Sequence, residues 1–201
     1  MQTRSLALGA FGAFAFAATT SAAVITFSQQ NVWSAYVAFQ NFAVVTEDFN
    51  SLTDGFYASG FSSSVSGITW TASAPGDLFA QGGFFSTNNP TSMTFSFSPG
   101  VQAVAGNFFG TDFNFNPVPS LVQVTLADGT STILLASGPA DFSGFFSTGS
   151  AISSLSITAA GAGTVYPTVD NLYFAVPIPA PGAAALIGLA AVATRRRRDV
   201  A

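Results

Sequence analysis

The chain has 201 residues, of which nine are acidic and five basic, and it contains no His or Cys. It therefore lacks the usual base of nucleophilic catalysis, the thiol nucleophile, disulfides and the side chains that transition metals prefer. The basic residues lie near the two ends, at Arg4 and at Arg195 to Arg198. The part between them is acidic, which argues against nucleic acid and anionic membrane surfaces as partners.

Residues 1–23 have the pattern of a secretory signal peptide. A basic start at Arg4 precedes an apolar stretch from about Leu6 to Ala18, and small residues follow it. We therefore expect export through the inner membrane, with cleavage by signal peptidase after Ala22 or Ala23. A buried N-terminal helix is the alternative, and the Ala-rich end of the segment agrees with it less well.

Residues 24–176 are long enough for one domain with its own core. Apolar and polar residues alternate with period two and are interrupted by Gly, Pro, Asn and Asp. This pattern predicts an all-β fold, a jelly-roll-like antiparallel β-sandwich. We expect strands at residues 24–28, 44–49, 66–72, 79–85, 93–98, 101–109, 111–116, 120–127, 130–136, 152–159 and 168–176.

Two turns and one helix complete the expected domain. Ser98-Pro99-Gly100 separates two strands, and Asp128-Gly129 predicts a hairpin with a type I′ turn. Near the start, the segment NVWSAYVAFQNF places its apolar residues at helical spacing, with Asn31 or Ser28 as N-cap. We expect a short helix whose Trp33 packs over one end of the sandwich and does not bind sugar.

The domain has eight acidic residues and no basic ones, so its carboxylates have no partner for a salt bridge. Each must be hydrated, accept backbone N–H hydrogen bonds or lie beside a bound cation. If the first and last strands are neighbours, Glu47 or Asp48 can share a structural Ca²⁺ with Asp170 and Asn171. The alternative is that these side chains cap strand ends and turns.

The segment from Asp112 to Asn116 begins like a calcium loop of the EF-hand type, with D-x-N-x-N spacing. Pro117 and Gln123 stand where that loop needs other residues, so we exclude it. On a strand, Asp112, Asn114 and Asn116 would share one face and the two intervening Phe would face the core. The polar face is then either solvated or part of a ligand groove.

Two further observations concern carbohydrate. Tyr57, in the Gly-rich segment DGFYASGF, is our candidate for an exposed ring that stacks on sugar, whereas Trp70 shares an inward face with Ile68. A glycosidase needs two carboxyl groups about 5–9 Å apart. Glu47 and Asp48 are adjacent on a strand and point to opposite faces, and no other pair stands out, so we expect no enzymatic activity.

Residues 177–201 form a distinct tail, PIPAPGAAALIGLAAVATRRRRDVA. Its prolines, Pro177, Pro179 and Pro181, interrupt the preceding strand, and an apolar run from Gly182 to Thr194 follows. The run is short for a bilayer span unless residues 176–181 are included. The arginines would remain on the cytoplasmic side.

The tail resembles the sorting signal of PEP-CTERM proteins, which combines a Pro-rich motif, an apolar segment and an Arg cluster. The central Glu of the motif is missing here. The motif is either Pro177-Ile178-Pro179 or Pro179-Ala180-Pro181, and the second, before Gly182, matches a variant form. The resemblance implies a C-terminal apolar helix that inserts transiently in the membrane and an exosortase-like protease that removes it. The matching residues are Pro177, Pro179, Pro181, Gly182, Arg195, Arg196, Arg197 and Arg198.

The segments VVTEDFNSL and VDNLYFAV resemble the first and last strands of jelly-roll cargo domains found on PEP-CTERM proteins. Together with the two ends, they lead us to expect an exported, exosortase-sorted protein of the cell surface or extracellular matrix, with a non-enzymatic structural or adhesive β-sandwich. The first alternative is a calcium-assisted carbohydrate-binding module acting on exopolysaccharide. A carboxylate-only glycosidase is the second alternative.

Overall fold

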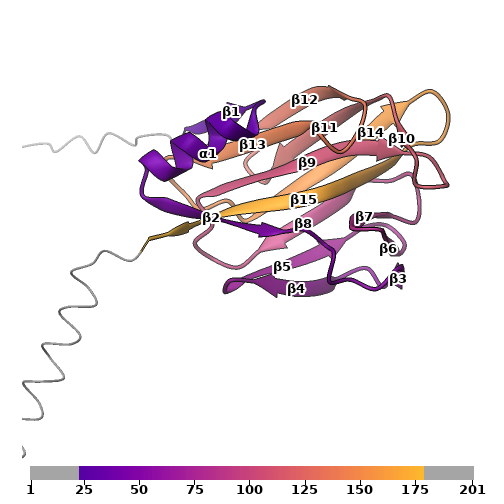
Figure 1. Ribbon diagram of the computed structural model, residues 1–201, viewed down its shortest axis with the longest axis horizontal. Helices are drawn as coiled ribbons and strands as arrows, with labels where there is room; N and C mark the ends of the chain where they lie inside the picture. Colours follow the sequence, from indigo (N-terminus) through magenta and orange to yellow (C-terminus); the bar gives the residue numbers. More distant parts are fainter. Residues whose placement is uncertain (1–22, 179–201) are drawn as a thin grey trace, which may run out of the picture.

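The computed structural model describes residues 23–178, which form two facing antiparallel β-sheets with one helix on the outside of the larger sheet (Figure 1). This confirms the expected all-β sandwich with a short helix near its start. The expected signal helix and the C-terminal apolar helix lie outside the described residues. Within residues 23–178, no helix is long and apolar enough to cross a membrane.

The larger sheet has nine strands in the order β1-β13-β9-β15-β7-β6-β3, with β10 added beside β9 and β2 beside β15. Its strands are β1 (Val24–Phe27), β2 (Phe42–Glu47), β3 (Gly55–Tyr57), β6 (Leu78–Gln81), β7 (Phe84–Thr87), β9 (Ala103–Thr111), β10 (Pro117–Val118), β13 (Phe142–Ser147) and β15 (Tyr166–Pro177).

The smaller sheet has six strands in the order β12-β11-β14-β8-β5-β4. They are β4 (Phe61–Val65), β5 (Ile68–Ser73), β8 (Met93–Phe97), β11 (Ser120–Leu126), β12 (Ser131–Ala136) and β14 (Ser154–Gly161). Apolar residues alternate along these strands, so one face is buried against the larger sheet and the other faces solvent.

The main core lies between the sheets and is rich in aromatic rings. Trp70, Phe85 and Phe95 are completely buried there, and Phe49 stacks on Phe85 with ring centroids 5.3 Å apart. Trp70 and Ile68 both face inward, as predicted. Burial of these large side chains supplies the hydrophobic stabilisation that a domain without disulfides needs.

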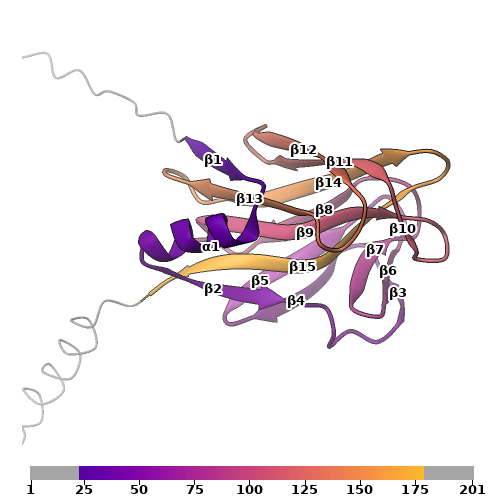
Figure 2. The same cartoon turned by 45° about the horizontal axis from the view of Figure 1, so that its top comes forward.

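A second cluster lies beneath helix α1 (Gln30–Phe39), on the outer face of the larger sheet (Figure 2). Trp33 is completely buried there, and its Nε1 donates a hydrogen bond to the backbone oxygen of Phe145 at 3.1 Å. The helix therefore covers a sheet face, not the end of the sandwich that we expected. Its N-cap is Gln29, without a side-chain hydrogen bond, so neither Asn31 nor Ser28 caps it.

Several strand predictions need correction. The segment 79–85 is not one strand, because Gly82 and Gly83 adopt positive φ and turn the chain between β6 and β7. The segment 111–116 is a turn, described below. Strands β3, β4, β10 and β13 were not predicted. Asp128-Gly129 does lie in a hairpin between β11 and β12, but only Gly129 has positive φ, so the turn is not type I′.

Candidate functional site

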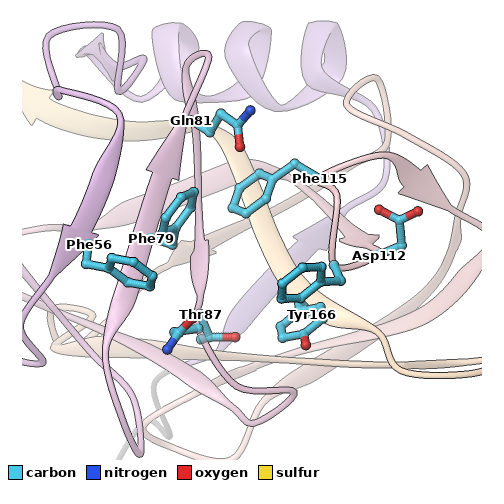
Figure 3. Close-up of a pocket in the computed structure, with 9 residues that line it drawn as sticks. Phe56, Phe79, Gln81, Thr87, Asp112, Phe115 and Tyr166 are labelled. Carbon is cyan, nitrogen blue, oxygen red and sulfur yellow. The ribbon is translucent and has the colours of Figure 1, made fainter.

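Strands β3 and β6 lie at the end of the larger sheet that is remote from α1 (Figure 1). An open groove of about 320 Å³ lies beside them (Figure 3). Aromatic side chains form most of its surface and polar groups complete it. Its lining residues are Phe56, Phe79, Gln81, Thr87, Asn88, Asp112, Phe113, Phe115 and Tyr166. We call this feature the aromatic groove.

One wall of the groove comes from neighbouring strands. Phe56 on β3 is the direct cross-strand partner of Phe79 on β6, so both side chains lie on the same face of the sheet. Their rings meet edge to face with centroids 4.8 Å apart. Phe56 nevertheless keeps 67% of its surface exposed, which leaves a broad apolar area open to solvent.

The opposite wall is the turn of residues 112–116. Asp112 Oδ1 accepts hydrogen bonds from the backbone N–H groups of Asn114 at 2.8 Å and Asn116 at 2.9 Å. These bonds fold the segment back on itself, and Phe115 adopts a positive φ of 64°. The Phe115 ring then contacts that of Phe79, with the ring centroids 5.0 Å apart. Phe113 is 79% exposed at the tip of the turn.

This geometry corrects the strand predicted for 111–116. Phe113 and Phe115 do not face the core, and the polar residues do not form a strand face. Asp112 does line the groove, whereas Asn114 and Asn116 stabilise the turn by donating their backbone N–H groups to Asp112. Hydrogen bonds from Asn116 lower the pKa of Asp112 below its ordinary value, and the bond from the Asn116 side chain has a larger effect than the bond from its backbone N–H. The carboxylate therefore remains ionised at neutral pH.

Three buried hydroxyl groups join the strands beside the groove. Thr168 on β15 lies 2.8 Å from Thr111 on β9, and it donates to Ser86 on β7 at 2.9 Å. Ser86 in turn donates to the backbone oxygen of Pro167. All three side chains are completely buried. The chain of hydrogen bonds fixes the strands that carry Thr87 and Tyr166, and so stabilises the shape of the groove.

Tyr57 is not the exposed sugar platform that we predicted. It is half-buried, and its ring contacts Phe61 and Phe85 at the margin of the main core. Its hydroxyl donates to the backbone oxygen of Thr53 at 2.8 Å. Its neighbour Phe56 is the exposed ring, because adjacent residues of a strand point to opposite faces.

The residues proposed for calcium separate into two groups. Strands β2 and β15 are neighbours, as the prediction required, with Glu47 opposite Leu172. Glu47 nevertheless faces the core, where it accepts hydrogen bonds from Phe49 N–H and Trp70 Nε1, each at 3.0 Å. Its two oxygens are thus used by the protein, which leaves Asp48, Asp170 and Asn171 as the remaining candidate ligands.

Asp48 and Asp170 influence each other electrostatically. Asp170 lies where the β15–β9 pairing is irregular, and desolvation followed by the Asp48 charge raises its pKa. Hydrogen bonds from Asn50 lower the pKa of Asp48. Among residues 23–178, no group of three or more His, Cys, Asp or Glu side chains is placed to hold a metal ion. Calcium binding by Asp48, Asp170 and Asn171 therefore stays a prediction.

Most of the described carboxylates instead accept backbone N–H hydrogen bonds. Asp54 accepts from Gly82, Asp128 from Thr130, and Asp141 from Ser137 and Gly138. Glu47 and Asp112 also accept backbone N–H hydrogen bonds, as described above, and Asp48 accepts one from Asn50. This pattern agrees with the alternative that these side chains stabilise strand ends and turns.

Of the sorting-signal residues, only Pro177 is described, and it is the last residue of β15. Pro179, Pro181, Gly182 and Arg195 to Arg198 lie outside the described residues. Comparison with known proteins adds no assignment, since no family model matches the chain and no curated protein is significantly similar to it.

Proposed function

We propose that this protein is exported, sorted by its C-terminal tail and displayed at the cell surface or in the extracellular matrix, where its β-sandwich acts as a non-enzymatic adhesive module. The observation that carries the non-enzymatic part is the use of the carboxylates. Six of them accept backbone N–H bonds: Glu47, Asp48, Asp54, Asp112, Asp128 and Asp141. These carboxylates stabilise the turns and strand ends of the domain.

The sorting part rests on the sequence of the tail and on the likeness to jelly-roll cargo domains. Support for that likeness comes from the pairing of β2, which contains VVTE, with β15, which contains DNLYFAV. Because β15 ends at Pro177, the tail starts where the last strand of the sandwich ends. A C-terminal signal in this position leaves the sandwich complete whether or not it is removed.

The adhesive part is supported by exposed apolar surface. Besides the aromatic groove, Leu121 on β11 and Ile133 and Leu135 on β12 are 55%, 67% and 78% exposed. Leu121 and Leu135 are direct cross-strand partners, so they share the outer face of the smaller sheet at its edge. Exposed apolar edge strands promote association with other molecules.

Replacement of Arg195 to Arg198 with Gln tests the sorting. We expect the variant to be exported but to remain in the cell membrane fraction with an altered mature mass, since the positive charge that marks the tail is gone. Asp199→Asn is the matched control, because it changes charge beside the cluster without removing an arginine. Unchanged location and unchanged mass in the Gln variant would contradict the proposal.

A second experiment tests the absence of catalysis. The purified protein is incubated with the polysaccharide of its producer, and newly formed reducing ends are measured. We expect none above background. Release of reducing ends that disappears in Asp170→Asn or Asp112→Asn would instead support a carboxylate-only glycosidase.

A further inference from the structure

We propose that the aromatic groove binds a neutral polysaccharide through the flat C–H faces of its sugar rings. The inference deepens the adhesive role proposed above and rests on it, because it names the site and the class of ligand. It differs from the carbohydrate site suggested by the sequence, since Tyr57 belongs to the core margin and calcium takes no part.

The first argument is the exposure of aromatic rings. Phe113 and Phe56 both line the groove and are 79% and 67% exposed. Phe79, Phe115 and Tyr166 add further aromatic surface to the same groove. Covering such surface with an apolar partner is favourable in proportion to the area removed from water. An aromatic face also carries partial negative charge, which attracts the weakly positive C–H groups of a sugar ring.

The second argument concerns the polar side chains that line the groove. Gln81 and Asn88 are exposed at the groove, and each amide offers both donors and an acceptor. The Asp112 carboxylate can accept hydrogen bonds but cannot donate them. A ligand that combines apolar faces with a rim of hydroxyl groups can satisfy both kinds of surface at once. A purely apolar lipid chain or a hydrophobic peptide segment would leave these polar groups unpaired.

The third argument concerns charge. Among residues 23–178, Asp112 is the only ionised group that lines the groove, and no Lys, Arg or His occurs between Arg4 and Arg195. An anionic polysaccharide would therefore meet a carboxylate and find no cation to balance its own charge. The groove is suited to a neutral chain.

The fourth argument is that the walls are organised before any ligand arrives. Asp112 holds the turn that presents Phe113, and the Ser86–Thr168–Thr111 hydroxyl groups fix the adjacent strands. Little conformational freedom is therefore lost when a ligand binds, which favours binding by rings that are already in place.

Affinity electrophoresis tests the proposal with purified protein from cells that express the full chain. Native gels contain neutral xylan, β-glucan or mannan, or anionic alginate, and the change in mobility gives a dissociation constant. We expect retardation by at least one neutral polysaccharide and none by alginate. Phe113→Ala and Phe56→Ala should each weaken binding about five- to tenfold, the loss of one aromatic contact. The matched control is Phe39→Ala, an 80% exposed ring on α1 far from the groove.

Each outcome decides the question. Weaker binding in the two groove variants but not in Phe39→Ala supports the site. Retardation by no neutral polysaccharide, retardation by alginate alone, or equal binding by all variants would overturn it. Addition of a chelator should change nothing. If the polysaccharide-binding experiment contradicts the groove proposal, the sorting proposal still stands or falls on the location and mass of the Arg195–Arg198 variant.

Discussion

Glu47 Oε2 accepts a hydrogen bond from Trp70 Nε1 at 3.0 Å, which joins the larger sheet to the smaller one through a buried carboxylate. The other oxygen of Glu47 holds the backbone of Phe49, whose positive φ of 55° turns its ring into the core. The Glu47 side chain thus accepts hydrogen bonds from the indole N–H of Trp70 and from the backbone N–H of Phe49.

Replacement of Glu47 with Ala should therefore lower the free energy of unfolding by about 2–5 kcal/mol, since two buried donors lose their acceptors. Glu47→Gln retains one acceptor oxygen and should cost about half as much. Chemical denaturation measures both, with Thr46→Ala, an exposed residue of the same strand, as reference. Equal losses for Gln and Ala would show that the charge matters and the individual hydrogen bonds do not.

Gly144 on β13 lies directly beneath Trp33 of the helix. A Cβ added there would be 2.7 Å from Trp33 Cδ1 and 3.0 Å from Phe142 Cε1. Gly144→Ala should lower the free energy of unfolding by about 1–3 kcal/mol, because the ring is packed on all sides. Gly138→Ala is the control, since its Cβ would have only Pro117 nearby, at 3.9 Å. Similar stability of both variants would mean that α1 is loosely attached.

Asp170 makes stability depend on pH. Its pKa in the folded protein is raised above the usual 3.8, chiefly by desolvation, so the folded state favours the protonated form. As the pH rises from 3.8 through the folded pKa, ionisation removes stability. Asp170→Asn should therefore be more stable than the wild type at neutral pH, by less than about 1 kcal/mol, with the difference closing near about pH 3.

Thermal melts of Asp170→Asn across this range measure the effect. Asp77→Asn is a control that removes an exposed charge. A constant difference between Asp170→Asn and the wild type at all pH values would contradict an ionisation effect and would indicate a change in packing.

The exposed apolar edge formed by β12 should make the protein associate with itself. Ile133→Lys and Leu135→Lys place charges on this edge and should reduce association, with stability changed by less than about 0.5 kcal/mol. Sedimentation velocity at several concentrations measures the association. Ser131→Lys adds the same charge to the same strand without removing apolar surface, so an equal effect of Ser131→Lys would exclude the apolar contact as the cause.

Some elements with one exposed face could be predicted from the sequence, although β4, which alternates in the same way, was missed. The strands β5 and β11 alternate between buried and exposed residues, and their period-two pattern is visible in the chain. Strand β13 is different, because α1 covers one face and the core covers the other, so all six of its residues are buried. Burial on both faces leaves the sequence of β13 without alternation, although it did not prevent the prediction of a strand at 101–109, which covers most of the equally buried β9.

The groove illustrates a different limit. The segment DFNFN alternates as a strand would, but Asp112 competes for the backbone N–H groups and folds the segment into a turn. Asp112 was found as a candidate, whereas Phe56, Phe79, Phe113 and Phe115 were not. Their approach depends on the pairing of β3 with β6 and on the position of the turn, both of which are set by contacts distant in sequence.

Strand β15 has a mechanical consequence. Its first residue, Tyr166, lines the groove, and its last, Pro177, leads into the tail. If the groove holds a polysaccharide and the tail is held at the cell, tension runs along these twelve residues, roughly 40 Å of strand. Hydrogen bonds to β9 and β2 flank that path and lie across the direction of pull. They would be loaded together in shear on either side of the irregular pairing at Asp170 and Asn171, so the molecule would resist detachment as a tether between its two points of attachment.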